Sequence, residues 1–174
     1  TLEGKNKQGY QDHPSAQAAI LKADLVILES YPSPYFLACD EQDMDKRYLY
    51  VETSRGCPYG CTYCMASLDR RLRLFSDTAM DAFFKQLKTS SVRQVKFLDR
   101  TFNVQKDRAL KLAQACLGMP EPMTFHVELV GDVLDDELKT LFMTQGKTRF
   151  RMEIGVQSLN PKTLDAVGRV SNLP

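Results

Sequence analysis

From residue 48 onward, the hydrophobic positions follow two alternating spacings, one of two residues and one of three to four residues. Apolar side chains at every second position predict four strands, at 48–53, 92–98, 124–130 and 149–156. Apolar side chains three and four positions apart predict helices between them, and the first such face holds Met80, Phe83, Phe84 and Leu87. Strands that alternate with helices are typical of βα units on a parallel sheet, so an α/β fold is predicted.

Capping residues mark the ends of the predicted helices. Ser76 precedes the first helix, and the second, expected at Lys106–Leu117, is followed by glycine and then proline. Asp135 caps the third helix, and Asn160 with Pro161 opens the fourth. The caps and the periodicity together predict four βα units.

The predicted strands are apolar on one face and polar on the other. In the third strand, Phe125, Val127 and Leu129 share one face, and His126 and Glu128 share the other. The fourth strand repeats the pattern, and its apolar face holds Phe150, Met152, Ile154 and Val156. We expect the apolar face of the sheet to pack against helices.

The polar face needs an explanation, because parallel strands that are covered on both sides are normally apolar throughout. It carries charged or amide side chains from all four strands: Glu52, Lys96, Glu128, Arg149, Arg151, Glu153 and Gln157. Charges away from water are costly unless they pair, so this face either borders a ligand or pairs internally. We expect Glu128 and Gln157 to face a polar ligand. An internal network is expected for Glu52, Lys96 and Arg151.

The segment before residue 48 carries little regular pattern. It is polar apart from a short apolar run at 25–28, and prolines at 32 and 34 favour extended backbone. We predict that residues 1–47 are a linker or the tail of an upstream domain, with a short helix at 17–22, and that residues 48–174 form the main domain. His13 and Cys39 are interpreted as a solvated side chain and an incidental thiol.

Composition narrows the functional classes. The chain has 174 residues, of which 43% are hydrophobic and 26% charged, and this fits one globular domain. The net charge is +1, and no basic run interleaves with aromatic residues, so a nucleic-acid partner is not supported.

No apolar run of membrane-spanning length and no signal peptide are found, and we expect a cytoplasmic protein without a membrane partner. Because the chain opens at Thr1 and stops near a helix, we expect it to be a fragment.

Three of the five cysteines, Cys57, Cys61 and Cys64, lie within eight residues at the spacing C-x3-C-x2-C. A tetrahedral zinc site usually closes with a second pair of ligands, and here Cys116 stands alone and His126 belongs to no paired motif. Three cysteines cannot all form disulfides with one another. An iron–sulfur cluster fits better, because a four-iron cluster held by three thiolates leaves one iron open to an outside ligand. A zinc-stabilised, non-catalytic interaction module remains the alternative from another class.

The residues around these cysteines suit a tight loop. In the cysteine loop, residues 55–64, Gly56 and Gly60 permit sharp turns that direct backbone N–H groups toward the sulfurs. Pro58 restricts the backbone of the same turn.

The motif Cys57-x3-Cys61-x-Tyr63-Cys64, directly after a predicted strand, resembles the cluster motif of the radical S-adenosylmethionine (radical SAM) superfamily. The resemblance implies that the three cysteines hold a 4Fe–4S cluster and that the amino and carboxylate groups of SAM bind its open iron. It also implies reductive cleavage of SAM to a 5′-deoxyadenosyl radical, which abstracts hydrogen from a substrate that the sequence does not identify. Tyr63 would lie beside the adenine. An electron donor such as flavodoxin or ferredoxin is implied as a partner.

The same resemblance implies a partial (β/α) barrel, the radical SAM core domain. Residues 48–174 are expected to form its N-terminal part, about four of six units. Superfamily members contact SAM through a Glu on the third strand, a Gln after the fourth and a later Arg, which correspond to Glu128, Gln157 and Arg169. Many members also carry a Gly-Gly-Glu stretch after the second strand. This chain has Leu-Asp-Arg there, and Asp99 is the implied substitute. Because two units lie outside the chain, we expect weak SAM affinity.

Longer segments, including Ser-Arg-Gly-Cys at 54–57 and Glu-Ile-Gly-Val-Gln-Ser at 153–158, resemble radical SAM proteins with an upstream cobalamin-binding domain. The resemblance implies cobalamin as a further cofactor, bound by a domain outside this chain. A cobalamin-dependent radical SAM methyltransferase is therefore the alternative enzymatic interpretation.

Overall fold

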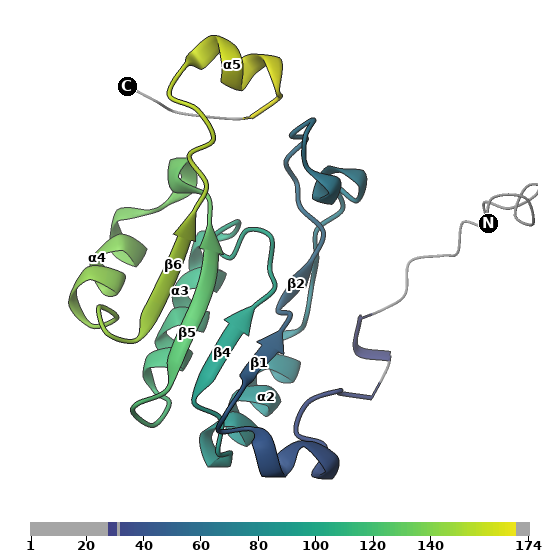
Figure 1. Ribbon diagram of the computed structural model, residues 1–174, viewed down its shortest axis with the longest axis vertical. Helices are drawn as coiled ribbons and strands as arrows, with labels where there is room; N and C mark the ends of the chain where they lie inside the picture. Colours follow the sequence, from purple (N-terminus) through teal and green to yellow (C-terminus); the bar gives the residue numbers. More distant parts are fainter. Residues whose placement is uncertain (1–27, 31, 170–174) are drawn as a thin grey trace, which may run out of the picture.

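A four-stranded parallel sheet forms the centre of the computed structural model, which describes residues 28–30 and 32–169 (Figure 1). The strand order is β1-β4-β5-β6, with bounds Tyr48–Val51, Gln94–Phe97, Thr124–Leu129 and Phe150–Ile154. The connecting helices are α2, α3 and α4, with bounds Asp77–Thr89, Lys106–Leu117 and Asp136–Thr144. The predicted α/β fold with a parallel sheet is confirmed, and it is consistent with a partial βα barrel.

Shorter elements surround the ends of the sheet. A two-stranded antiparallel sheet pairs β2 (Ser54–Arg55) with β3 (Arg73–Leu74), and the 3-10 helix η3 (Met65–Leu68) lies between them. Figure 1 shows α5 (Pro161–Ala166) beyond the C-terminal ends of the strands, at the end of the sheet where the β2–β3 excursion also projects. Three further 3-10 helices are η1, η2 and η4, at Leu28–Ser30, Ala38–Asp43 and Gly131–Val133. No helix of the described residues combines the length and apolar character needed to cross a membrane.

The hydrophobic core lies between the sheet and the three connecting helices. The predicted apolar faces of β4 and β5 are buried, and Phe97 and Phe125 stack with their ring centroids 6.4 Å apart. Phe142 of α4 packs edge-on against Phe150 at 4.8 Å. The helix face predicted from the sequence is also buried and contributes Met80, Phe83, Phe84 and Leu87.

Part of the predicted linker packs on this domain. Tyr35 and Phe36 place their rings 5.4 and 5.6 Å from that of Phe83, and the Tyr35 hydroxyl accepts a hydrogen bond from the Glu52 amide at 3.1 Å. The short helix expected at 17–22 and His13 lie outside the described residues. The domain boundary at residue 48 stays a prediction.

The apolar face of the fourth strand is less covered than predicted. Met152 and Ile154 are 41% and 43% exposed, and Val156, which lies beyond β6, is 57% exposed. The reason is that β6 is the edge strand of the described sheet, and α5 continues beyond its end instead of packing behind it.

Arg149 is not on the polar face, where the alternation placed it. Its side chain is buried, and the guanidinium donates to the carbonyl oxygens of Met123, Met119 and Cys116 at 2.7, 3.0 and 3.3 Å. Arg149 precedes β6 and is therefore outside the strand pleat that the prediction assumed. It satisfies carbonyl groups at the end of α3, where a positive charge is favourable.

Some side chains of the polar face form pairs, but their partners differ from those expected. Glu52 pairs with Arg55, and Arg151 donates to the Tyr48 hydroxyl at 3.1 Å. Within the described residues, no ion pair links Lys96 to Glu52. The expected network is therefore replaced by separate local contacts.

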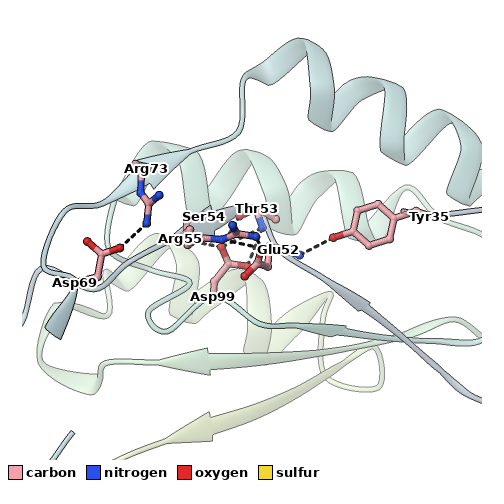
Figure 2. Close-up of polar contacts among 8 residues, drawn as sticks. All are labelled: Tyr35, Glu52, Thr53, Ser54, Arg55, Asp69, Arg73 and Asp99. Atoms are coloured by element: carbon pink, nitrogen blue, oxygen red, sulfur yellow. Dashed lines mark hydrogen bonds and ion pairs between the residues drawn. The ribbon is translucent and has the colours of Figure 1, made fainter. Parts of the chain in front are cut away.

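A buried carboxylate joins the ends of β1 and β4 (Figure 2). Asp99, which is 1% exposed, accepts hydrogen bonds from the Thr53 amide at 3.2 Å, from the Thr53 hydroxyl at 2.8 Å and from the Ser54 hydroxyl. The Leu98 amide also donates to the Val51 carbonyl at 2.7 Å. Burial raises the pKa of Asp99, and the hydrogen bonds from Ser54 and Thr53 oppose that rise. The start of the cysteine loop is thus fixed to the sheet.

Replacing Asp99 should destabilise the fold. Asp99→Ala leaves three buried donors without an acceptor, and we expect the free energy of unfolding to fall by about 3 kcal/mol. Urea unfolding followed by circular dichroism measures the change. Asp45→Ala, which removes an exposed carboxylate, is the control and should change the stability by less than about 0.5 kcal/mol. Equal losses in the two variants would contradict the role given to Asp99.

The same group should give the stability a characteristic pH dependence. Because burial raises the pKa of Asp99 above its ordinary 3.8, the folded chain holds this proton more tightly than the unfolded chain. Its contribution to stability is therefore greatest at low pH and is lost as the pH rises through the raised pKa. The free energy of unfolding of the wild type and of Asp99→Asn is measured by urea unfolding at about pH 4 and about pH 7. The wild type should exceed the variant by less at pH 7 than at pH 4. A larger difference at pH 7 would show that the pKa is lowered instead.

Candidate functional site

A cavity of about 210 Å³ lies where the cysteine loop meets the C-terminal ends of the strands. Its lining includes all but one of the residues predicted to bind a cluster or SAM: Cys57, Cys61, Tyr63, Cys64, Glu128, Gln157 and Arg169. These residues come from the cysteine loop, from β5 and from the segments after β6. Segments far apart in the sequence therefore meet at one cavity, at the end of the sheet where βα proteins place their sites.

The cysteine loop is closed by its glycine and by backbone hydrogen bonds. Gly56 has φ +93°, and a Cβ atom there would lie 2.2 Å from the Arg71 carbonyl oxygen, so only glycine fits. The Cys57 amide donates to the Asp69 carbonyl at 3.1 Å, and the Asp69 carboxylate pairs with Arg73 (Figure 2). The loop thus returns on itself directly beside the first cysteine.

The three cysteines differ in exposure. Cys57 and Cys61 are buried, Cys64 is exposed, and all three are free thiols. Among the residues that the structure describes, no three His, Cys, Asp or Glu side chains converge as ligands of a single metal ion. The donor set is therefore three separate sulfurs around one cavity.

Two tyrosines of the loop adjoin these thiols. The pKa of Tyr59 is raised by burial and by the neighbouring Cys57. The pKa of Tyr63 is also raised, again by burial first and then by Cys61, although the residue is 52% exposed. Both hydroxyls therefore stay protonated at neutral pH, and the half-exposed Tyr63 ring is available for contact with a planar group.

The segment after β6 is held against the cysteine loop by backbone contacts. The Thr62 amide donates to the Val167 carbonyl at 2.9 Å. Gly168, at φ +63°, approaches so closely that a Cβ there would lie 3.2 Å from the Gly60 carbonyl oxygen. These contacts position Arg169, which donates to the Gly155 carbonyl at 2.9 Å and leaves other guanidinium N–H groups for a ligand.

Gln157 has an unusual backbone conformation. It lies in the left-handed region at φ +66°, which costs a non-glycine residue about 1–2 kcal/mol. Its amide folds back over Gly155, where a Cβ atom would be 2.6 Å from Gln157 Nε2. The glycine therefore makes room for an amide that borders the cavity.

Two carboxylates lie side by side at the wall of the cavity. Glu128 of β5 is in register with Glu153 of β6, and Glu153 lies 3.3 Å from His126 Nε2. The Glu128 carbonyl accepts from the Phe102 amide at 2.9 Å, which fixes its backbone. Carboxylates here can accept hydrogen bonds from hydroxyl or amino groups, and Arg169 can pair with a carboxylate.

Asp99 is the predicted site residue that the structure places elsewhere. Its carboxylate is directed to Thr53 and Ser54, and the next residues, Arg100 and Thr101, border the cavity instead. Neither residue was predicted from the sequence to belong to the site. The position directly after a predicted strand was the available signal, because βα folds place site residues there.

Comparison with known proteins agrees with this arrangement. A family profile described as the radical SAM superfamily matches residues 51–173. The chain is also 25% identical, over 127 residues, to a protein of Pyrococcus horikoshii named as an uncharacterized methyltransferase. That match covers 68% of this chain and 26% of the relative, so the chain spans about a quarter of the relative's length. Because the family match covers well over half of the sequence and includes the cysteine loop, the chain belongs to the radical SAM superfamily.

Proposed function

We propose that this chain is the core of a radical SAM enzyme, in which Cys57, Cys61 and Cys64 hold a 4Fe–4S cluster. The observation that carries the proposal is that these three free thiols border one cavity together with polar side chains from two strand ends. Three thiols at one cavity suit a cluster, in which each sulfur binds a different iron. When bound, the cluster supplies the electron that cleaves SAM to methionine and a 5′-deoxyadenosyl radical, which abstracts hydrogen from a substrate.

The surrounding residues would bind and orient SAM. Glu128 and Gln157 offer the acceptors and donors that ribose hydroxyls require, and Arg169 offers a guanidinium for the carboxylate. The Tyr63 ring would lie against the adenine. Asp99 would act indirectly, by fixing the start of the cysteine loop. The substrate stays open, and flavodoxin or ferredoxin is the proposed class of electron donor.

A second candidate is methyl transfer by the same core. The similarity to a protein named as a methyltransferase favours it. Cobalamin would enter only through a domain outside this chain, as the sequence resemblance implies. The products separate the two candidates, because methyl transfer yields a methylated substrate.

Iron analysis tests the cluster directly. Anaerobic reconstitution with iron and sulfide should give about four irons per chain, and Cys57→Ala should lose most of this iron. Cys39→Ala, which removes an exposed thiol outside the cavity, is the matched control and should keep wild-type iron. One equivalent of zinc and no iron in the wild type would favour the non-catalytic zinc module instead.

The SAM site is tested on the reconstituted chain. Electron paramagnetic resonance of the reduced cluster should change when SAM is added, and Gln157→Ala should raise the half-saturating SAM concentration by about tenfold. Gln114→Ala, on the exposed face of α3, should leave it unchanged. A wild-type response in Gln157→Ala would remove this residue from the site.

A further inference from the structure

A buried threonine contacts the first cysteine of the loop. Thr101, which follows β4, is 4% exposed, and its Oγ1 lies 3.8 Å from Cys57 Sγ. The same hydroxyl donates to the Arg100 carbonyl at 2.8 Å. Both side chains border the cavity, so the contact lies where a cluster held by Cys57 would bind.

The protons carried by the two groups decide which of them donates the hydrogen bond. A thiol and a hydroxyl can each donate, and the distance alone does not decide which does. While the Thr101 proton is donated to the Arg100 carbonyl, the thiol is the donor. A thiolate has no proton and can only accept. Once Cys57 ligates iron as a thiolate, only the Thr101 hydroxyl can donate in this pair, and to do so it turns its single proton from the Arg100 carbonyl to the sulfur.

The backbone around Thr101 is held on both sides. Asp99 is bound to Thr53 and Ser54, as described above. On the other side, buried Asn103 donates to the Val130 carbonyl at 2.8 Å and accepts from the Val130 amide at 3.0 Å. The hydroxyl is therefore presented to the sulfur by a segment with little freedom to move.

We propose that Thr101 is a positioning residue that raises the reduction potential of the cluster by donating a hydrogen bond to the Cys57 sulfur. A hydrogen bond to a ligand sulfur withdraws negative charge from the cluster and favours the state that carries the extra electron. Loss of the hydroxyl makes the cluster harder to reduce. This inference rests on the proposed function, because it requires a cluster at Cys57.

Three substitutions at Thr101 test the inference. Thr101→Val keeps the shape and removes the hydroxyl, Thr101→Ala removes it with less volume, and Thr101→Ser keeps it. Each reconstituted chain is titrated with reductant while the reduced cluster is measured by electron paramagnetic resonance. At the wild-type midpoint, the ratio of reduced to oxidised cluster should fall about tenfold in Thr101→Val, a shift of about 59 mV for one electron. Thr101→Ala should shift in the same direction, and Thr101→Ser should stay near wild type.

The outcomes separate this inference from the proposed function. Wild-type midpoints in both Thr101→Val and Thr101→Ala, with full iron content, would overturn the role of Thr101 and leave the cluster assignment intact. An equal shift in Thr101→Ser would also overturn it, because the hydroxyl is present there. If the wild type assembles no cluster, both proposals fail together. Thr140→Val, at an exposed position on α4, is the control and should not shift the potential.

Discussion

The carboxylate of Asp99 joins the ends of β1 and β4 at the point where the cysteine loop begins. Without this contact, Thr53 and Ser54 would present buried donors with no acceptor, and the start of the loop would keep only the contacts of its backbone, such as the pairing of Ser54 with Leu74. The positions of the three sulfurs relative to the strand ends therefore depend on it. The residues that follow Asp99 approach the same loop, and through Thr101 they reach Cys57 itself. Asp99 thus fixes the start of the cysteine loop and the segment that carries Thr101, and both border the cavity.

A second set of contacts closes the cavity from the opposite side. The chain after β6 turns over the strand ends, and the hydrogen bond from Thr62 to Val167 attaches it to the cysteine loop. Gln157 in this turn has a left-handed backbone, a local cost that the hydrogen bond from Arg169 to the Gly155 carbonyl helps to offset. The cavity is therefore a junction of three backbone segments, each held by hydrogen bonds that do not involve a ligand. A cofactor bound there, as proposed, would need little reorganisation of the chain.

The sheet shows where reasoning from sequence patterns is reliable and where it is not. Alternation in β4 and β5 located their buried faces, because both strands have neighbours on each side and helices behind them. The same rule misplaced Arg149 and overestimated the burial of Met152 and Ile154. Arg149 lies outside the pleat, and β6 has a single neighbour in the described sheet. Alternation identifies the side of a strand, but the surroundings of that strand determine whether the side is covered.

The sequence by itself determined the chemistry that the chain offers: three thiols at a spacing suited to a cluster, caps and periodicities for four βα units, and polar residues at strand ends. These features are local, because they depend on the order of neighbouring residues. Only the tertiary structure decided that Asp99 is an anchor and that Thr101 contacts Cys57. Each of these roles depends on a partner more than forty residues away, whose direction and distance are set by strand register and by the packing of helices on the sheet. Local patterns carry no information on such distances, so these contacts could not be predicted from the sequence.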